Sequence, residues 1–460
     1  MADNNADFIV VGGGPGGYAA AFRAADLGRK VTLIDPRPAL GGVCLNEGCI
    51  PSKALLHAAE VLREARHMGD WGISFGEPTI DLDRLRARKD DTIGKLTGGL
   101  GQLAKRRRVT VVQGTAEFTG PQDLSVNGES WHFEQAVVAV GSDPVVLPGW
   151  PEDRRIWDST AALELREIPK RLSVVGGGII GLEMATVYAA LGSEVTVIEL
   201  AGGIAQGADR EACAILAAEL AEQSITIYTD TRVEKVSAEK SGITLHCVGE
   251  KAPKKIEADV VIQSVGRRAR GDRVAAEKAG LSVSKRGEIA VDGCCRTEQS
   301  HIFAIGDVTG GPMLAHRATH QGKVAAEVAC GHHASMDSVL IPSVAYTNPE
   351  LAWIGLTVDQ AKEQGVDHAV TSFPWAASGR NLASGGSDGL TKLIYDPNSH
   401  RLLGAAIVGR GAGELLAELG LAIEMGCRLE DVALAVHAHP TLSETIAFSA
   451  ERALGTLTDL

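Results

Sequence analysis

The sequence predicts an α/β fold made of two similar halves, followed by an α+β segment at the C-terminus. An internal repeat is the main observation. Residues 8–35 read as an apolar strand, a glycine-rich turn, a helix over 18–27 and a second strand that ends in an acid, and residues 172–199 repeat this order. The length of 460 residues corresponds to about three domains. In the final segment we expect a strand over 392–395 and a helix over about 412–425.

Both halves carry the pattern G-x-G-x-x-G between a strand and a helix. Its glycines are Gly12, Gly14 and Gly17 in the first half and Gly176, Gly178 and Gly181 in the second. Asp35 and Glu199 end the following strands at the same distance from the first glycine. In a dinucleotide-binding turn the glycines permit a tight turn, a close approach of the pyrophosphate and helix–strand packing, while the acid binds a ribose hydroxyl. The sequence therefore predicts two Rossmann-like dinucleotide-binding domains rather than ordinary glycine-rich turns.

Cys44 and Cys49 flank four residues just before a predicted helix. Two thiols this close in sequence are able to form a disulfide, and the amides at a helix N-terminus stabilise a thiolate. This pattern indicates a redox-active disulfide, with a static disulfide or half of a metal site as the alternatives. The other cysteines show no zinc-ligand spacing, so we expect no metal site; they are Cys213, Cys247, Cys294, Cys295, Cys330 and Cys427.

The composition limits which binding partners and which cellular compartment we expect. The formal net charge of −13 disfavours a nucleic-acid partner. No apolar run reaches membrane-spanning length, and the N-terminus shows no basic and apolar secretory pattern. We therefore expect a cytoplasmic protein without a membrane partner. In a reducing cytoplasm a disulfide is usually catalytic or redox-sensing.

Two dinucleotides and a dithiol together suggest electron transfer between a nicotinamide, a flavin and sulfur. The first glycine turn precedes the cysteine loop, so we expect FAD in the first half. Residues 200–203, which follow Glu199, contain no Arg or Lys to meet a 2′-phosphate, and this favours NAD over NADP in the second half.

Taken together, these motifs resemble the family of pyridine nucleotide-disulfide oxidoreductases, and most closely its dihydrolipoamide dehydrogenases. The resemblance covers essentially the whole chain. It extends to residues 139–142, 265–268, 301–307, 314–317 and 437–444. It implies further FAD-binding positions at Gly42, Lys53, Gly114, Ser142, Asp307 and Ala315, and an NAD-binding position at Gly266.

The C-terminal residues His439 and Glu444 are candidates for a base and its carboxylate partner. Pro440 is expected to open a helix, which would bring the Glu444 carboxylate back toward the imidazole. From the residues alone, a catalytic and a structural role for His439 remain equally open. The resemblance implies that His439 is the catalytic base and that His437 is structural or supporting.

The resemblance also implies an activity: a flavoprotein oxidoreductase that oxidises dihydrolipoamide to lipoamide and reduces NAD⁺. Cys44 would exchange with the substrate, and Cys49 would be the thiolate beside the flavin. Lys53 and Glu183 match positions that pair near the flavin ring, with a surface role for each as the alternative. The implied partners are a second copy of the chain in a homodimer and the lipoyl domain of a 2-oxo acid dehydrogenase or glycine cleavage complex.

Pro- and Gly-rich segments set the expected domain boundaries. We expect a first FAD-binding segment over 1–146, an NAD-binding domain over 147–270, a central segment completing the FAD site over 271–340, and an interface or dimerisation domain over 341–460.

Several residues depart from the family pattern. Val140 replaces a usual threonine, Asp35 is shorter than the commoner glutamate, and Arg380–Asn381 differs from the usual pair. The adjacent Cys294 and Cys295 are expected to be reduced structural thiols, because a vicinal disulfide is strained; a second redox site is the alternative. Rival functions are a glutathione reductase, a mercuric reductase, and a flavoprotein redox sensor or assembly subunit with little turnover.

Overall fold

The computed structural model describes residues 4–337, 339–386 and 388–458. Contacts divide the chain into two compact units. The first unit contains residues up to 54, 81–145 and 266–337, and the second contains 55–80, 146–265 and the described residues from 339 onward. The boundaries predicted at 146, 270 and 340 stay predictions of domain limits.

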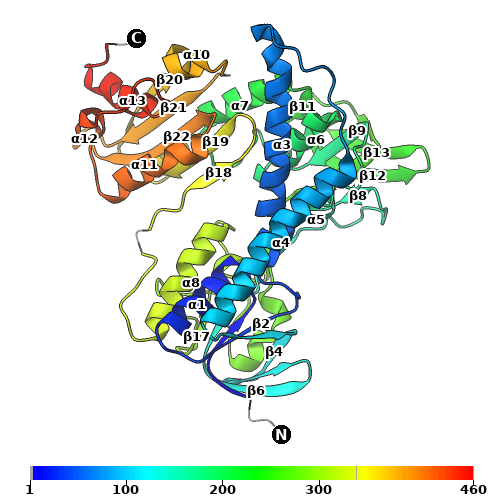
Figure 1. Cartoon of the computed structure of the whole chain (residues 1–460), viewed down its shortest axis with the longest axis vertical. Coiled ribbons are helices and arrows are strands. Elements are labelled where there is room, and N and C mark those ends of the chain that lie inside the picture. Colours follow the sequence, from blue (N-terminus) through cyan, green and yellow to red (C-terminus); the bar gives the residue numbers. More distant parts are fainter. Residues whose placement is uncertain (1–3, 338, 387, 459–460) are drawn as a thin grey trace. The chain divides into compact units, whose positions relative to one another are not determined.

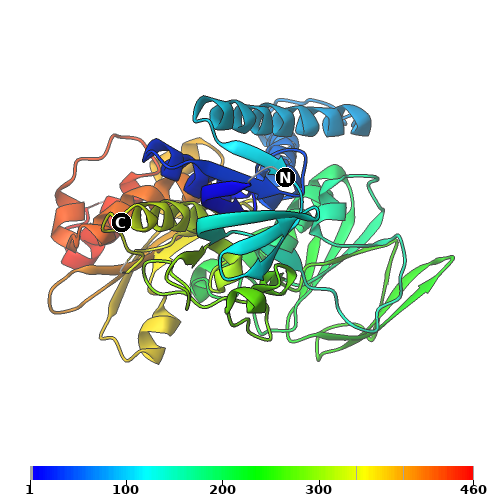
Figure 2. The ribbon, with the colours of Figure 1, turned by 90° about the horizontal axis from the view of Figure 1, so that it is seen from below.

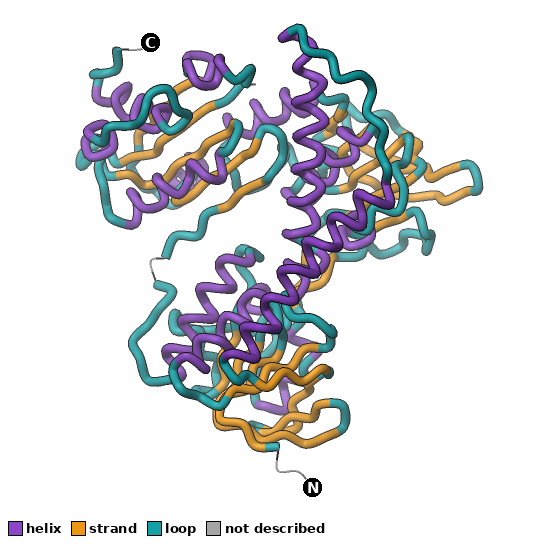
Figure 3. Tube along the Cα trace, in the orientation of Figure 1, coloured by secondary structure: helices purple, strands orange, loops and turns teal. Residues whose placement is uncertain are grey.

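The first unit is built on a mixed sheet of seven described strands, and Figure 3 shows the sheets of both units with helices along their faces. Strands β3, β2, β1, β6 and β17 lie in this order, and each of the four neighbouring pairs is parallel. Strand β5 pairs with β6, and β4 pairs with β5, both in antiparallel fashion. The strands are β1 (Asn5–Val11), β2 (Val31–Asp35), β3 (Thr110–Gln113), β4 (Ala116–Gly120), β5 (Asp123–Val126), β6 (Glu129–Val138) and β17 (Ile302–Ala304). Every residue of β2 is buried, as expected for a parallel strand covered on both faces.

Two helices of the first unit, α1 (Pro15–Asp26) and α8 (Ala315–Ala329), lie side by side (Figures 1 and 2). They approach so closely that a Cβ on Gly322 would lie 2.4 Å from the Gly16 carbonyl oxygen. A helix was expected from residue 18, but α1 begins at Pro15. Proline suits a first helical position because its φ is preset and its missing N–H would be unpaired there anyway.

The first unit also contains α4 (Leu82–Arg106), η2 (Gly271–Arg273) and η3 (Ala276–Ala279). Site residues are carried by α2 (Gly42–Glu47), η4 (Gly306–Thr309), and the paired strands β7 (Ser142–Pro144) and β16 (Arg267–Ala269). Helix α3 (Cys49–His67) begins in the first unit and continues into the second.

The second unit contains the repeated half. A parallel sheet has the order β11-β10-β9-β15-β8, and a three-stranded antiparallel sheet has the order β12-β13-β14. The elements are β8 (Ile156–Trp157), α5 (Ser159–Leu163), β9 (Arg171–Val175), α6 (Ile179–Leu191), β10 (Glu194–Ile198), α7 (Arg210–Glu222), β11 (Ile225–Tyr228), β12 (Arg232–Glu239), β13 (Gly242–Val248), β14 (Lys255–Ala258) and β15 (Val260–Gln263).

The C-terminal part of the second unit is an antiparallel sheet of order β18-β19-β22-β21-β20, packed against helices. Its elements are β18 (Ser343–Ala345), β19 (Glu350–Gly355), α9 (Val358–Glu363), β20 (Ala369–Pro374), η5 (Trp375–Ala377), α10 (Gly379–Ala383), β21 (Leu390–Tyr395), β22 (Leu402–Gly409), α11 (Ala412–Glu424), α12 (Leu429–Leu434) and α13 (Glu444–Leu454). The predictions of a strand over 392–395 and a helix over about 412–425 are confirmed by β21 and α11. The mixed α/β fold class is confirmed as well.

The part of the chain that the structure describes lacks both a membrane-spanning helix and a cluster of metal ligands. No described helix is both long and apolar enough to cross a bilayer. Nor do the described His, Cys, Asp and Glu residues form a group of three or more that could hold a metal ion.

A buried ion pair joins the two parts of the second unit. Lys392 of β21 places its Nζ 2.9 Å from Oδ2 of Asp209 and 3.0 Å from Oε2 of Glu211. Burial lowers the pKa of Lys392, but the hydrogen bond and charge of Asp209 outweigh it and raise the pKa overall. Asp209 also caps α7 by accepting from the N–H groups of Glu211 and Ala212. Lys392 therefore stays charged and ties α7 to the C-terminal sheet.

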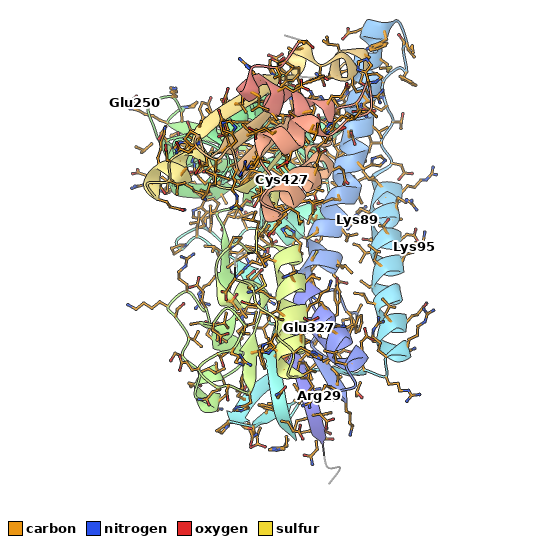
Figure 4. The ribbon with its side chains drawn as sticks, turned by 90° about the vertical axis from the view of Figure 1, so that its left-hand side faces the viewer. Arg29, Lys89, Lys95, Glu250, Glu327 and Cys427 are labelled. Carbon is orange, nitrogen blue, oxygen red and sulfur yellow. The ribbon has the colours of Figure 1, made fainter. Side chains whose placement is uncertain are left out.

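Replacing Lys392 with methionine should destabilise the second unit. The Asp209 side chain is only 2% exposed and would be left without its cation, so we expect the free energy of unfolding to fall by about 3–5 kcal/mol. Chemical denaturation measures this loss. The matched control is Lys95→Met on α4, labelled in Figure 4, since Lys95 also pairs with an aspartate but its side chain is 68% exposed. Equal losses in the two variants would contradict the prediction.

Candidate active site

The first glycine turn lies between β1 and α1. Gly12 has φ +109°, and a Cβ there would lie 2.3 Å from the carbonyl oxygen of Ala139. A Cβ on Gly17 would lie 1.8 Å from the carbonyl oxygen of Gly12. Around Gly14, in contrast, the nearest atom to such a Cβ is the Cα of Gly42 at 3.9 Å. The outer glycines are therefore required by packing, and Gly14 leaves room at the N-terminus of α1.

The second turn, between β9 and α6, repeats this geometry. Gly176 has φ +112°, and its Cβ would lie 2.2 Å from the carbonyl oxygen of Ser264. A Cβ on Gly181 would lie 2.1 Å from the carbonyl oxygen of Gly176, whereas one on Gly178 would meet nothing within 4 Å among the described atoms. The repeat in the sequence is thus a repeat in three dimensions.

Asp35, at the end of β2, binds the first turn. Its Oδ2 accepts from the N–H of Gly13 at 2.5 Å, and its Oδ1 accepts from the N–H of Arg37 at 2.8 Å. Gly114 donates its N–H to the Asp35 carbonyl oxygen at 3.0 Å, so this predicted position lies at the same strand end. The shorter aspartate still reaches the turn, and a carboxylate retains further lone pairs for a ribose hydroxyl.

Glu199, at the end of β10, makes the equivalent contacts. Its Oε2 accepts from the N–H of Gly177 at 2.6 Å and its Oε1 from that of Ala201 at 2.7 Å. Gly266, predicted as an NAD-binding position, is the first residue of the last segment of the first unit and has φ +120°. Its part in nucleotide binding stays a prediction.

The cysteine loop is packed directly against the first turn. The N–H of Gly41 donates to the carbonyl oxygen of Gly13 at 2.8 Å. Gly42 has φ +57°, and a Cβ on it would lie 2.6 Å from the Cα of Gly14. Helix α2, which carries the first thiol, therefore starts at the point where the backbone leaves room for a pyrophosphate.

The two thiols of this loop are in contact. The Sγ atoms of Cys44 and Cys49 lie 2.6 Å apart, so a disulfide requires no rearrangement of the backbone. Donation to the Cys49 sulfur, burial, and the negative charge of Cys49 raise the pKa of Cys44, whereas the charge of Lys53 opposes the rise. In the dithiol form Cys44 thus keeps its proton, and Cys49 is the first residue of α3, where a helix N-terminus favours a thiolate.

Tyr18 of α1 is a neighbour of the thiols that the sequence pattern did not reveal. Burial raises the pKa of its phenol, and negative charge on Cys44 and Cys49 raises it further. The phenol therefore stays neutral next to the thiol pair. The only sequence signal was its place in the first turn of a helix that follows a dinucleotide motif.

Ser142 and Asp307 are brought together in the first unit although they come from distant segments. The Ser142 hydroxyl donates to Oδ2 of Asp307 at 2.5 Å. Arg267 donates from Nε to the same hydroxyl at 2.7 Å and from Nη2 to the Ser142 carbonyl oxygen at 2.8 Å. Ala315, another predicted FAD position, is the first residue of α8. Arg267 was missed as an organising residue because its partner lies far away in sequence.

Lys53 and Glu183 belong to different units, so their expected pairing stays a prediction. Lys53 lies on α3 one turn after Cys49. Glu183 lies on α6, where only 4% of it is exposed, and its Oε1 accepts from the N–H of Tyr346 at 3.1 Å. The alternative of a surface charge does not describe Glu183, because this carboxylate is buried.

His439 and Glu444 form a hydrogen-bonded pair. Nδ1 of His439 lies 2.8 Å from Oε1 of Glu444, and Oε2 of Glu444 accepts from the N–H of Thr441 at 2.7 Å. A carboxylate at Nδ1 selects the tautomer with a proton there and leaves the lone pair on Nε2. The His439 side chain is 80% exposed and that of Glu444 only 12%. The pair thus presents a basic nitrogen at the surface of the chain.

His437 has a different environment. Its Nδ1 lies 2.8 Å from the carbonyl oxygen of Ala435 and its Nε2 lies 2.7 Å from Oε1 of Glu418. With a side chain 9% exposed and both nitrogens engaged, it is suited to a supporting role rather than to proton transfer.

The vicinal cysteines have the character of structural thiols. Burial raises the pKa of Cys295 to about 12, and this residue belongs to the apolar core of the first unit. Cys294 packs against the same core, and its N–H donates to Oδ1 of Asp292. Cysteines packed against an apolar core are typically inert structural residues.

The backbone N–H groups at the two glycine turns fit two dinucleotides. In each half a glycine, Gly14 or Gly178, is the N-cap of a helix, and a Cβ on either would lie no closer than 3.9 Å to the nearest atom of the part of the chain that the structure describes. Within the described residues, no side chain caps either helix, so the first N–H groups are available for a pyrophosphate.

Comparisons with known proteins agree with this geometry. The model of the pyridine nucleotide-disulphide oxidoreductase family matches residues 6–322, and that of the dimerisation domain of the same family matches residues 341–450. The dihydrolipoyl dehydrogenase of Vibrio parahaemolyticus serotype O3:K6 is 50% identical over 461 residues, which cover 99% of this chain and 97% of the relative. The dihydrolipoyl dehydrogenase of Vibrio cholerae serotype O1 is 51% identical with the same coverage.

A solved structure supports the same assignment. The HOCl-induced flavoprotein disulfide reductase RclA from Escherichia coli matches with a TM-score of 0.86 and 28% identity, over 97% of this chain and 99% of that chain. The predicted enzyme class, a flavoprotein disulfide oxidoreductase, and the predicted cofactors, FAD and NAD, are confirmed by these comparisons. Matched along nearly its whole length, the chain belongs to the pyridine nucleotide-disulphide oxidoreductase family.

Proposed function

We propose that this chain oxidises protein-bound dihydrolipoamide to lipoamide and reduces NAD⁺, using Cys44 and Cys49 as its redox disulfide. The contact between the two thiols, packed against the first dinucleotide turn, is the observation that carries the proposal. The predicted activity itself is confirmed by the name shared by relatives that span nearly the whole chain. The roles of individual residues remain our proposal.

The first half of the reaction is a thiol–disulfide exchange. Nε2 of His439 takes a proton from one substrate thiol, and the resulting thiolate attacks Sγ of Cys44. The bond between Cys44 and Cys49 breaks and leaves a thiolate on Cys49. The second substrate thiol then attacks the mixed disulfide, lipoamide closes its ring, and Cys44 leaves with a proton.

The two electrons from the substrate are then held by the cysteine pair. We propose that the negative charge resides on Cys49, because the pKa of Cys44 is raised and Cys44 keeps its proton. Bound FAD supplies a two-electron relay from this thiolate to NAD⁺ at the second turn. The balance is one dihydrolipoamide and one NAD⁺ consumed, and one lipoamide, one NADH and one proton formed.

The base is proposed to act on the disulfide of a second copy of the chain. The match to a dimerisation domain supports a homodimer. In the single chain the His439 side chain is 80% exposed, as expected if its target belongs to another subunit. We further propose that the lipoyl domain of a 2-oxo acid dehydrogenase or glycine cleavage complex presents the substrate, and that the protein acts in the cytoplasm.

Substrate assays separate this proposal from its rivals. Dihydrolipoamide with NAD⁺ should support turnover, whereas NADP⁺ should support far less, because Glu199 occupies the position that would meet a 2′-phosphate. Glutathione disulfide with NADH or NADPH should be reduced poorly. A preference for NADPH and glutathione disulfide would identify a glutathione reductase, and slow turnover with every pair would favour a redox sensor.

The two cysteines should be distinguishable by substitution. Cys44→Ser keeps the thiol proposed to lie beside the flavin, so the oxidised variant with bound FAD should absorb at longer wavelength than wild type. Cys49→Ser should lack this band. Both variants should lose dihydrolipoamide oxidation, measured by NADH formation. A band in Cys49→Ser and none in Cys44→Ser would reverse the assigned roles.

Mixing inactive subunits tests whether the site is shared. After subunit exchange, Cys44→Ser and His439→Gln chains in equal amounts should regain about a quarter of wild-type activity, because half of the dimers are mixed and each has one intact site. Cys44→Ser mixed with Cys49→Ser is the control and should stay inactive, since no disulfide is complete. If the first mixture stays inactive although mass spectrometry shows subunit exchange, the whole site lies within one chain.

A further inference from the structure

A chain of buried hydrogen bonds lies under the first turn of α13. Trp375, Thr391 and Thr445 are each 0% exposed. The indole Nε1 of Trp375 donates to Oγ1 of Thr391 at 2.9 Å, and the hydroxyls of Thr391 and Thr445 lie 2.8 Å apart. Oγ1 of Thr445 lies 2.7 Å from the carbonyl oxygen of Leu442. The last contact is made to the loop between His439 and α13.

Donor capacity gives this chain a direction. An indole N–H only donates, and a carbonyl oxygen only accepts. Thr391 therefore accepts from Trp375 and donates its own hydrogen to Thr445. Thr445 in turn donates to Leu442. Each hydroxyl has one donor hydrogen, and in this arrangement every one of them is used.

The start of the chain is held rigidly. Trp375 lies on two glycines of the C-terminal sheet: a Cβ on Gly409 would lie 2.3 Å from the indole ring, and one on Gly389 would lie 2.8 Å from it. The backbone N–H of Trp375 also donates to the carbonyl oxygen of Gly389 at 2.8 Å. The indole therefore has little freedom to move or tilt.

The end of the chain adjoins the proposed base. Leu442 follows Thr441, whose N–H binds Oε2 of Glu444, and Thr445 follows Glu444 directly on α13. Oε1 of the same carboxylate is the partner of His439. Any displacement of the loop or of the first turn of α13 would change the direction in which Glu444 holds the imidazole.

We propose that Thr445 is a positioning residue for the His439–Glu444 pair, and that the hydrogen bonds from Trp375 through Thr391 give it a fixed reference in the core. Thr445 acts through Glu444 and does not touch the substrate. This inference rests on the proposed function, in which His439 is the base.

The chain offers a matched control in the same buried layer. Ser449 lies one turn further along α13 and is also 0% exposed. Its hydroxyl lies 2.9 Å from the carbonyl oxygen of Thr391 and 2.8 Å from that of Thr445. These contacts fasten α13 to β21 but make no hydrogen bond to the loop that carries Thr441. Loss of this hydroxyl should cost stability without turning Glu444.

The experiment compares Thr445→Val, Thr445→Ser and Ser449→Ala as FAD-loaded full-length enzyme. Thr445→Val should lower kcat for dihydrolipoamide with NAD⁺ by about tenfold or more, with little change in KM. Thr445→Ser keeps the hydroxyl and should restore the rate to near wild type. Ser449→Ala should lower the melting temperature without a comparable fall in kcat. Oxidation of NADH by ferricyanide, which does not use the base, should be unchanged in all three.

A double-variant cycle separates positioning from general damage. In a Glu444→Gln background, Thr445→Val should have almost no further effect on kcat, because the orientation it protects is already lost. A full additional loss in that background, or an equal loss of the ferricyanide reaction, would overturn the proposal. If Thr445→Val does not fold, Thr391→Val removes the same hydrogen bond from the other side and is judged by the same readouts.

Variants of His439 and Glu444 distinguish a wrong assignment of the base from a wrong assignment of Thr445. Wild-type rates in both His439→Gln and Glu444→Gln would reject the proposed base. A large loss in those two variants, together with an independent loss from Thr445→Val, would reject the positioning role alone.

Discussion

The close approach of two glycines, Gly14 and Gly42, is the constraint on which the site depends. A Cβ on Gly42 would lie 2.6 Å from the Cα of Gly14, so the cysteine loop reaches the dinucleotide turn only because Gly42 has no side chain. The N–H of Gly41 then fixes the loop to the carbonyl oxygen of Gly13. Sulfur chemistry and nucleotide binding are brought together by backbone packing rather than by a specific side-chain contact.

Charge in the site is distributed by equally local effects. The contact with Cys49 and burial raise the pKa of Cys44, so Cys44 keeps its proton, and Cys49 lies at the N-terminus of α3. In the C-terminal part of the chain, Glu444 uses one oxygen for His439 and the other for a backbone N–H. Cys44 and His439 thus each have a hydrogen-bond partner in place before any substrate arrives.

Much of the fold could be predicted because its signals are local. The glycine turns, the acids at the strand ends and the strand and helix of the C-terminal segment all follow from short-range patterns, and the structure has them at the expected positions. The contacts that escaped prediction join distant segments: Arg267 with Ser142, Lys392 with Asp209, and Thr391 with Thr445. No periodicity marks such pairs, since each residue is ordinary in its own segment. Likewise, His437 and His439 look alike in sequence and differ only in what surrounds them.

The two glycine turns also limit which mutations the protein tolerates and how such mutations are suppressed. At Gly12, Gly17, Gly176 and Gly181, the atom that a Cβ would strike first is a backbone carbonyl oxygen. A collision with a side chain is relieved by making that side chain smaller, whereas a carbonyl oxygen is present whatever residue carries it. A second substitution elsewhere therefore cannot relieve the collision at these four positions by making a neighbouring side chain smaller. Suppressors of a mutation there would have to move the main chain, and with it the strand–helix unit that binds the nucleotide.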